Sequence, residues 1–421
     1  MARGARILGA LLLVGALGAS TVARAGLFDD AGEVTAELHA SDAATRREAV
    51  DKLDALSAEA ARPYLEAALG DLDLEVRARA ARSIGRHRLI ALAPRLETLL
   101  GGPEPTLRAA AAEALGALGQ GDRAAAARFC RPLERALSDA DHNVRVQVVR
   151  ALGRLPPIEA RAVAAPLTAR LEDENTTVRA EAAEVLGALG DRRAVIPLIG
   201  RLSDPSRDVK RAALGALGAL GDPGAAPAML RLVSPSQPDE VRADAVQALG
   251  RLGARAAIEP LIGLLAHPGD PLAGQAAFAL GQIARATQPT PRAARDLDPH
   301  AARAAAAPAS PAVATASDAA AAPAPPAVAN ARDAAPAIAA LTSALGRDET
   351  RTAAREALAV VGARAVPALL ARLEAASGEE LDAVVELLGT LGDRRATGPL
   401  TDELASGRLL RERVVGALGA I

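Results

Sequence analysis

Residues 178–202, VRAEAAEVLGALGDRRAVIPLIGRL, contain two short amphipathic patterns in succession. Apolar residues at positions 178, 182, 185, 186 and 189 have the spacing of one face of a helix. We expect Gly190 to end this helix, because glycine adopts the left-handed cap conformation at little steric cost. A second apolar stripe, at positions 195, 198, 199 and 202, predicts a second helix that tolerates Pro197 in its first turn. The stretch therefore predicts a pair of helices joined by a tight turn.

The same helix pair recurs along the chain in one register. The position of Val178 is occupied in successive units by Thr45, Val76, Leu107, Val144, Val178, Val209, Val241, Leu272, Thr350, Glu380 and Leu410. Neighbouring positions are 30 to 37 residues apart, except for the interval between 272 and 350. A glycine stands nine residues after each position, with Asp54 and Ala359 as the exceptions. A fixed period of this length predicts a helical solenoid.

Charged residues also follow the register. An aspartate stands five residues before it in several units, and a basic residue usually follows it directly. The aspartates are Asp71, Asp139, Asp173 and Asp204, and the basic residues include Arg46, Arg77, Arg108, Arg145, Arg179, Arg242 and Arg351. We expect the aspartates to cap the first helix of each pair. We also expect the arginines to pair with loop aspartates of their own or neighbouring units.

This pattern resembles the HEAT superfamily, in particular the short repeats of the phycobilisome-lyase HEAT-like type. The residues that carry the resemblance are DENTTVRAEAAEVLGALGDRRAVIPLIGRL, with Asp, Val-Arg, Leu-Gly, Gly-Asp and Pro-Leu in order. The resemblance implies an all-α fold, a right-handed α-solenoid of about ten helix pairs, with the second helices on the concave face. It leaves the function open, because folds of this kind have many unrelated roles.

The first 25 residues differ from the rest and predict a secretory signal peptide. Arg3 and Arg6 precede an apolar run over residues 7–19, and Ala23-Arg24-Ala25 fits a cleavage site. The run is short for a membrane span, although an uncleaved anchor remains the alternative. Cleavage before Gly26 would remove three arginines and change the formal charge from −2 to −5. We therefore expect an exported protein, in the bacterial periplasm or another extracytoplasmic space, that does not bind nucleic acid.

The remaining chain divides into two blocks of repeats, residues 26–284 and 336–421. Between them, residues 285–335 are rich in alanine and proline and predict a disordered insertion between the two helices of one repeat. Such an insertion costs little, because closure entropy grows slowly with loop length. It is either a docking arm or a low-complexity insert without a role. The last pattern, residues 410–419, is a first helix without a second, which predicts a terminal cap or a chain that continues.

Residues suited to catalysis or metal binding do not cluster in the sequence. The histidines fall in different units, none is followed by glutamate, and no phosphate-binding loop or nucleophile motif is present. The single cysteine, Cys130, excludes an internal disulfide, and beside Phe129 we expect it to be buried. Aromatic residues are limited to Tyr64, Phe28, Phe129 and Phe278. We therefore predict no catalysis, no cofactor and no metal.

One set of arginines suggests a binding surface. Arg170, Arg201 and Arg231 lie at equivalent positions in the second helices of three consecutive units, each just before a core leucine. Stacking would place them in a column, which favours a carboxylate-rich partner segment. The alternative is pairing with nearby Glu172, Asp173 and Asp204. We thus predict a scaffold that binds another protein, with a lyase-type or other enzyme-associated subunit that holds a substrate protein as the alternative.

Overall fold

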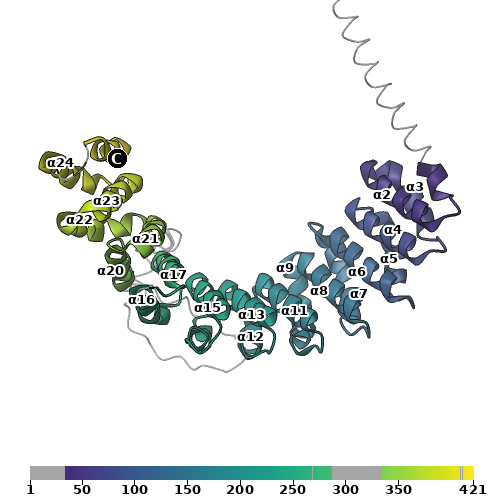
Figure 1. Ribbon diagram of the computed structural model, residues 1–421. Coiled ribbons are helices and arrows are strands. Elements are labelled where there is room, and N and C mark those ends of the chain that lie inside the picture. Colours follow the sequence, from purple (N-terminus) through teal and green to yellow (C-terminus); the bar gives the residue numbers. More distant parts are fainter. Residues whose placement is uncertain (1–33, 268, 287–333, 408, 410) are drawn as a thin grey trace, which may run out of the picture. The chain divides into compact units, whose positions relative to one another are not determined.

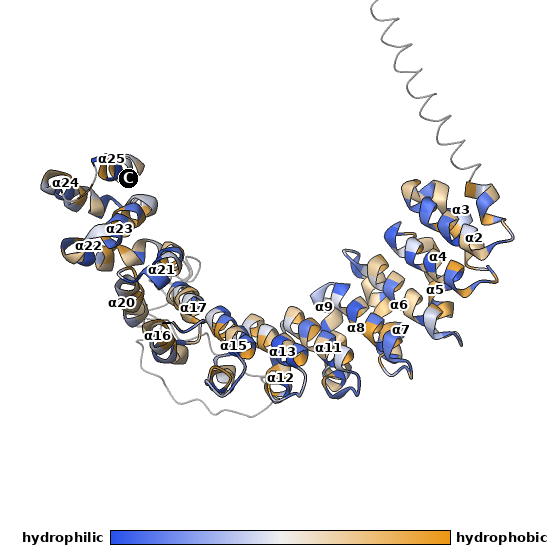
Figure 2. Cartoon of the chain, viewed as in Figure 1, coloured by the Kyte–Doolittle hydropathy of each residue, from blue (hydrophilic) through white to orange (hydrophobic). Residues whose placement is uncertain are grey.

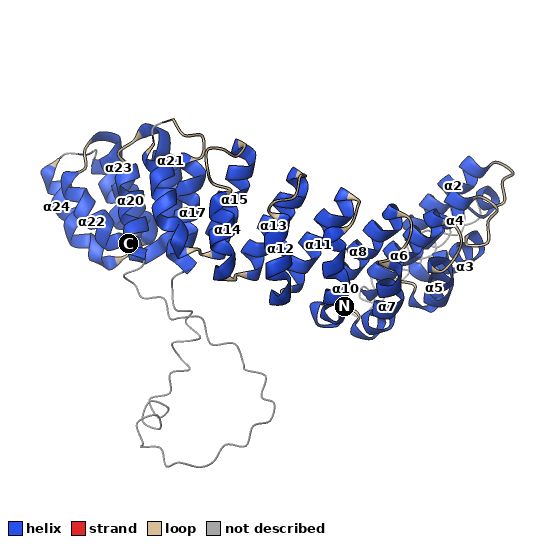
Figure 3. Cartoon of the chain, turned by 90° about the horizontal axis from the view of Figure 1, so that it is seen from below, coloured by secondary structure: helices blue, strands red, loops and turns tan. Residues whose placement is uncertain are grey.

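The computed structural model describes residues 34–267, 269–286, 334–407, 409 and 411–421 (Figure 1). The predicted signal segment and all but the ends of the predicted insertion lie outside these residues. The described part consists of helices and the loops between them, with no strand in it (Figure 3). Its residues fall into two compact units, divided between Ala216 and Leu217, which we describe separately. The predicted all-α solenoid is confirmed.

In the first unit, the first and second helices of successive repeats alternate along the chain (Figure 1). The first helices are α2 (Ala43–Lys52), α4 (Leu74–Arg86), α6 (Pro105–Gly119), α8 (His142–Arg154), α11 (Thr176–Leu189) and the larger part of α13 (Arg207–Leu220). The second helices are α3 (Ala58–Ala68), α5 (Ala93–Leu100), α7 (Arg123–Ala136), α10 (Ala164–Ala169) and α12 (Val195–Arg201), with the short α9 (Pro157–Ala160) before α10. From α2 to α11 each first helix packs against the next first helix, and second helices such as α5 and α7 pack against the first helix that follows them.

The second unit continues this order. Its first helices are α15 (Asp239–Leu252), α17 (Ala273–Ala286), α21 (Asp348–Val361), α23 (Gly378–Leu391) and α25 (Arg411–Ala420). Its second helices are α14 (Ala226–Arg231), α16 (Ile258–Ala266), α20 (Ala335–Ala344), α22 (Val366–Ala375) and α24 (Thr397–Ser406). Helices α17 and α20 pack against each other although residues 287–333 separate them in sequence. Those two helices therefore form one repeat.

Most second helices begin with a short 3₁₀ turn. These turns are η1 (Leu53–Ala55), η2 (Ile90–Leu92), η3 (Arg161–Val163), η5 (Arg192–Ala194), η6 (Pro223–Ala225), η7 (Arg255–Ala257), η9 (Gly362–Ala365) and η10 (Arg394–Ala396), while η4 (Arg170–Glu172) follows α10. Gly190, which precedes η5, has a φ of 69°, so it ends α11 in the predicted left-handed conformation.

The first helices are capped by a residue other than the one that we expected. Asn175, three residues before the register position, accepts a hydrogen bond from Val178 N at 3.2 Å. Asp173, the expected cap, lies two residues too early to reach the helix amides. Its Oδ1 accepts from Asn175 N in the loop at 3.0 Å. The capping prediction was therefore wrong, because Asp173 orders the loop and leaves the cap to Asn175.

The core is a series of thin layers of alanine, leucine and valine between helices. Figure 2 shows apolar and polar residues side by side on most helices, as expected for helices that bury one face. Large side chains are fully buried at intervals along the stack, among them Leu65, Leu115 and Leu186. Phe129 is fully buried and Cys130 is 6% exposed, which confirms the expectation of a buried thiol.

Neighbouring first helices approach each other closely at the recurring glycines. A Cβ atom on Gly116 would lie 2.6 Å from Ala151 Cα, and one on Gly389 would lie 2.7 Å from Ala417 Cα. Side chains at these positions would therefore collide with the backbone of the next repeat. Within each unit these close approaches lie in the layer of first helices.

One exception to the glycine pattern has a local explanation. Asp54 occupies the glycine position of the first repeat, and Ser83 occupies the alanine position that faces it. The Ser83 hydroxyl donates a hydrogen bond to Asp54 Oδ1 at 2.5 Å, and Ser83 is fully buried. A polar pair therefore replaces the glycine–alanine contact at this joint.

Candidate functional site

The arginines that follow the register position join neighbouring repeats. Arg145 in α8 reaches Asp173 in the loop before α11, with Nε–Oδ2 and Nη2–Oδ1 distances of 2.8 and 2.7 Å. Its Nη1 also donates to Asp139 O at 2.9 Å. The two side chains are only 6% and 3% exposed. This bidentate, buried pair fixes one repeat to the next, so the predicted pairing is confirmed.

Three further joints in the first unit have the same geometry. They are Arg46–Asp71 (2.7 and 2.9 Å), Arg108–Asp139 (2.7 and 2.8 Å) and Arg179–Asp204 (2.9 and 3.1 Å). Hydrogen bonds from Arg46 and Arg108 hold the pKa values of Asp71 and Asp139 below their ordinary value. Burial opposes ionisation of Asp173, but the bonds from Arg145 and Asn175 N outweigh it, and the pKa of Asp173 is also lowered.

The series of joints is interrupted once in the first unit. Arg77 in α4 directly follows the register position, as the arginines of the other joints do. Gly102 stands where its partner aspartate would be. The turn itself is unchanged, because Gly102 N donates to Leu99 O as Asp71 N donates to Ala68 O. The Nε atom of Arg77 is buried without a hydrogen-bond partner among the described residues. Gly102 therefore leaves a guanidinium without its carboxylate.

The corresponding arginines of the second unit differ from each other. Arg242 is 8% exposed and contacts Asp239 at 2.6 Å and Asp270 at 3.3 Å, which are 62% and 17% exposed. Arg351 pairs with Asp348 at 2.5 Å and also with Glu379, which are 88% and 76% exposed. The Arg351 joint therefore remains open to water, whereas the Arg242–Asp270 pair is largely buried.

Two of the three predicted binding arginines also serve the joints between repeats. Arg170 Nη1 donates to Leu137 O, the C-terminal cap residue of α7, at 3.1 Å. Arg201 Nη1 donates to Leu171 O of the preceding repeat at 3.1 Å, and its Nη2 lies 2.6 Å from Glu172. The structure thus gives these two arginines the pairing that the sequence left as the alternative.

Arg231 differs from the other two. It ends α14 in the second unit, its side chain is exposed, and it has no ion pair with a described residue. A role in partner binding stays a prediction for all three arginines. Of the three, Arg231 has the guanidinium most accessible to a partner.

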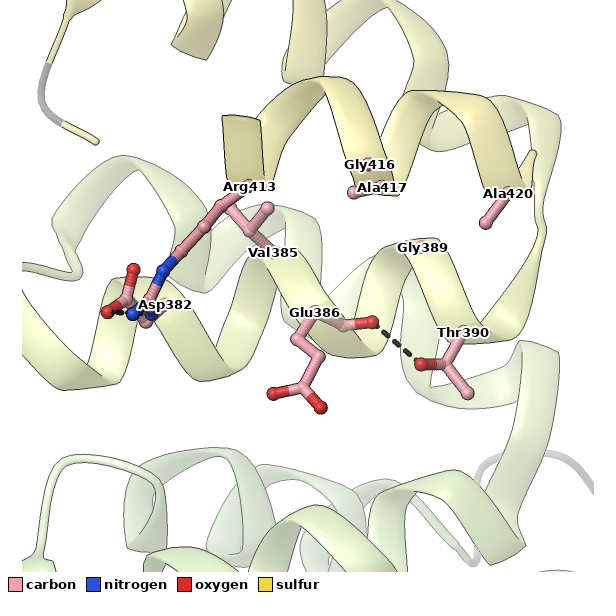
Figure 4. Close-up of a pocket in the computed structure, with 9 residues that line it drawn as sticks. All are labelled: Asp382, Val385, Glu386, Gly389, Thr390, Arg413, Gly416, Ala417 and Ala420. Carbon is pink, nitrogen blue, oxygen red and sulfur yellow. Dashed lines mark hydrogen bonds and ion pairs between the residues drawn. The ribbon is translucent and has the colours of Figure 1, made fainter. Parts of the chain in front are cut away.

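A cavity of about 410 Å³ lies between α23 and α25 (Figure 4). Arg413 of α25 pairs with Asp382 of α23 across its mouth, and Thr390 Oγ1 donates to Glu386 O at 2.8 Å. The two charges of this cavity that pair with each other are therefore Arg413 and Asp382, although Asp382 Oδ1 has no hydrogen-bond partner among the described residues. Its wall near Gly389 consists of helix backbone, which leaves little chemistry for a specific ligand.

A second cavity, of about 500 Å³, lies between α15, α17 and α21. Phe278 of α17 contributes to its lining and is 42% exposed. Our sequence analysis did not select Phe278. The sequence contained a signal that could have identified Phe278 as exposed. The residue six positions after the register position is usually polar, as Gln247 and Glu356 are. Phe278 is an aromatic residue at that exposed position.

The described residues offer no constellation for catalysis or metal binding. Within them, no group of three or more histidine, cysteine, aspartate or glutamate residues is placed to hold a metal ion. The ring of His87 contacts the carbonyl of Leu53 at 3.1 Å, and that of His267 contacts the carbonyl of Gly263 at 2.6 Å. Among the described helices, none has the length and apolar character needed to cross a membrane.

Comparison with known families gives two matches. The family model described as HEAT repeats matches residues 33–116, 92–165 and 164–250, which together span more than half of the chain. The model described as PBS lyase HEAT-like repeat matches residues 241–267. A search of curated protein sequences gives no match.

Solved structures with similar backbones are distant in sequence. YibA of E. coli is 16% identical, with a TM-score of 0.48, and the match covers 62% of this chain and 96% of YibA. An engineered protein is 19% identical, with a TM-score of 0.39, and the match covers 93% of this chain and 98% of that protein. At these scores neither structure informs the function.

Proposed function

We propose that this chain, which belongs to the HEAT-repeat family, is an exported scaffold that binds another protein and catalyses no reaction of its own. The observation that carries the proposal is the form of one cavity. The cavity between α15, α17 and α21 lies between consecutive repeats and is lined by residues of neighbouring first helices. Open grooves of this kind suit an extended segment of a partner better than an enclosed small substrate.

The joints between repeats support the same function. Buried pairs such as Arg145–Asp173 hold successive repeats of the first unit in register. A partner that binds along several repeats then meets a surface that is already ordered, which reduces the entropy lost on binding. The exposed Arg231 is the element of the predicted second-helix surface that best fits this role, through an acidic segment of the partner.

Export is the second part of the proposal and rests on residues 1–25. We expect the chain expressed in a bacterium to be recovered from the periplasm with Gly26 as its first residue. N-terminal sequencing of the periplasmic fraction measures this directly. Recovery of intact chain in the cytoplasm would contradict the proposal of export and leave protein binding unaffected.

The experiment that tests binding is crosslinked capture from an envelope extract, with the purified chain as bait. Parallel baits carry Arg231→Glu, or lack residues 287–333. The matched control is Arg394→Glu, which reverses another exposed arginine in the second unit. A stoichiometric partner retained by the control and lost with Arg231→Glu would place binding on the second-helix surface. Loss only with the deletion would move it to residues 287–333.

The alternative, an enzyme-associated subunit, is separated by turnover. A captured partner that leaves the complex chemically modified would favour a subunit that holds a substrate for modification. A partner recovered unchanged and in constant ratio to the chain supports the scaffold. Failure of every bait to retain a partner would overturn the proposal of a protein-binding scaffold.

A further inference from the structure

The groove between α15, α17 and α21 combines an exposed aromatic ring with acidic side chains. Phe278 is one of three phenylalanines in the chain, and it is 42% exposed where Phe129 is fully buried. The ring lines a cavity of about 500 Å³, where it offers an apolar surface that a side chain of a partner can cover. The ring therefore marks a place where an apolar side chain can be bound.

The charge around the ring has one sign. Asp244 from α15 and Glu356 from α21 line the groove together with Phe278, and no basic residue lines it. Glu356 is exposed and has no ion pair with a described residue. Because Glu356 is exposed and no described residue neutralises it, the groove at Phe278 favours a cationic ligand beside Glu356.

The remaining side chains suit a peptide main chain. Gln247 of α15 and Gln275 of α17 are exposed and line the same groove, and a glutamine amide can both donate and accept hydrogen bonds. At Gly274 a Cβ atom would lie 3.7 Å from Ala353 Cβ, so the absence of a side chain leaves the groove open. Amides beside an apolar floor are what an extended peptide needs to be held in one orientation.

We infer that this groove binds an extended segment of a partner protein in which an arginine or lysine lies next to an apolar residue. The apolar residue covers Phe278, and the cation lies beside Glu356. The inference rests on the proposed function, because it names the chemistry of a partner for the scaffold. It predicts a basic segment, in contrast to the acidic segment expected at Arg231.

Charge complementarity selects this occupant over the others. An acidic segment would place its carboxylates against Glu356, which is unfavourable. A second copy of this chain would make the groove an interface between copies. That occupant gives a different result, namely self-association that depends on Phe278.

The test is a selection of random linear peptides displayed on phage, with the purified chain as the target. We expect enrichment of sequences with arginine or lysine beside a leucine, methionine or aromatic residue. The most enriched sequence is then synthesised with a fluorescent label, and its affinity is measured by anisotropy at two salt concentrations. Binding should weaken at the higher salt, because exposed charge pairs are screened.

Variants in the groove assign the binding site. Phe278→Ala should weaken binding of the enriched peptide about tenfold, as loss of an interface anchor does. Glu356→Lys should weaken it by at least about tenfold through like-charge repulsion. Gly274→Leu should block the groove while it removes no charge. The matched controls are Ile196→Ala, at an exposed apolar residue of α12, and Glu240→Lys, at an exposed acid of α15, and both should bind as the wild type does.

Each outcome decides the inference. Enrichment of acidic or uncharged peptides, no enrichment at all, or basic peptides that bind Phe278→Ala unchanged would overturn it. Dimerisation lost with Phe278→Ala in sedimentation experiments would overturn it in favour of a second copy. If the peptides fail while envelope capture still yields a stoichiometric partner, the groove is excluded and the scaffold stands. Circular dichroism of each variant establishes that it folds.

Discussion

The joints between repeats differ between the two units in how far they exclude water. In the first unit, Arg145 and Asp173 are 6% and 3% exposed and are joined by two hydrogen bonds. In the second, Arg351 is 18% exposed, but its partners Asp348 and Glu379 are 88% and 76% exposed. The same arginine position is thus used for a buried pair at Arg145 and for water-exposed pairs at Arg351, while Arg242 and Asp270 of the second unit are 8% and 17% exposed.

The difference shows that the register alone does not set the strength of a joint. A buried charge that loses its partner is left without water, whereas an exposed charge is solvated again. The aspartate five residues before the register position makes the buried joint, and in the second unit that position holds other residues, such as His267 and Ala375. We therefore expect the first unit to be held together more rigidly by its charges than the second.

The largest effect is expected from breaking the buried joint. Asp173→Ala removes the buried carboxylate from Arg145 and leaves it only the exposed Glu174 at 3.2 Å, so it should lower the free energy of unfolding by about 3 kcal/mol. Glu379→Ala, the matched change in the second unit, should lower it by less than about 1 kcal/mol. Urea denaturation followed by circular dichroism measures both. Equal effects of the two substitutions would show that burial does not distinguish the joints.

The next effect concerns the glycines that bring first helices together. Gly187→Ala would place a Cβ atom 2.6 Å from Ala216 Cα, so we expect a loss of about 1 to 3 kcal/mol. At Gly215 a Cβ atom would have no neighbour within 4 Å, so Gly215→Ala should stabilise α13 by about 1 kcal/mol through helix propensity. Thermal unfolding of the two variants should therefore shift in opposite directions. A shift of the same sign for both would contradict the close-packing argument.

The sequence predicted the parts of this structure that depend on spacing. The period set the helix pairs, and the recurrence of arginine and aspartate at fixed positions predicted pairs such as Arg145–Asp173. It failed where two polar residues competed for one role, because Asp173 and Asn175 are both suitable caps and only the backbone geometry chooses between them. The exposure of Phe278 could not be inferred from its residue type, because aromatic residues are usually buried.

A smaller effect should appear in acid. Arg108 lowers the pKa of Asp139 in the folded chain, so this carboxylate stabilises the fold at any pH above its ordinary value of about 4. That contribution is lost as the pH falls through the lowered value of the folded state. The difference in stability between wild type and Asp139→Asn should thus be constant near neutral pH and shrink below about pH 4.

The control for the acid experiment is Gly215→Ala, whose effect comes from helix propensity and should not change with pH. Urea unfolding at several pH values gives both curves. A difference for Asp139→Asn that stays constant down to about pH 2 would show that the Arg108 pair does not act through ionisation of this carboxylate.

The smallest effect sharpens the comparison by adding a joint instead of removing one. Gly102→Asp supplies the carboxylate that Arg77 lacks, in a turn whose hydrogen bond matches the one at Asp71. A Cβ atom at position 102 would lie 3.1 Å from Leu99 O, and this tight contact offsets part of the stability gained from the new ion pair. We expect a net stabilisation of about 0.5 to 1 kcal/mol, as for a partly exposed pair. The gain should vanish when Arg77→Ala is added, and a gain that survives in the double variant would mean that the aspartate acts on the loop alone.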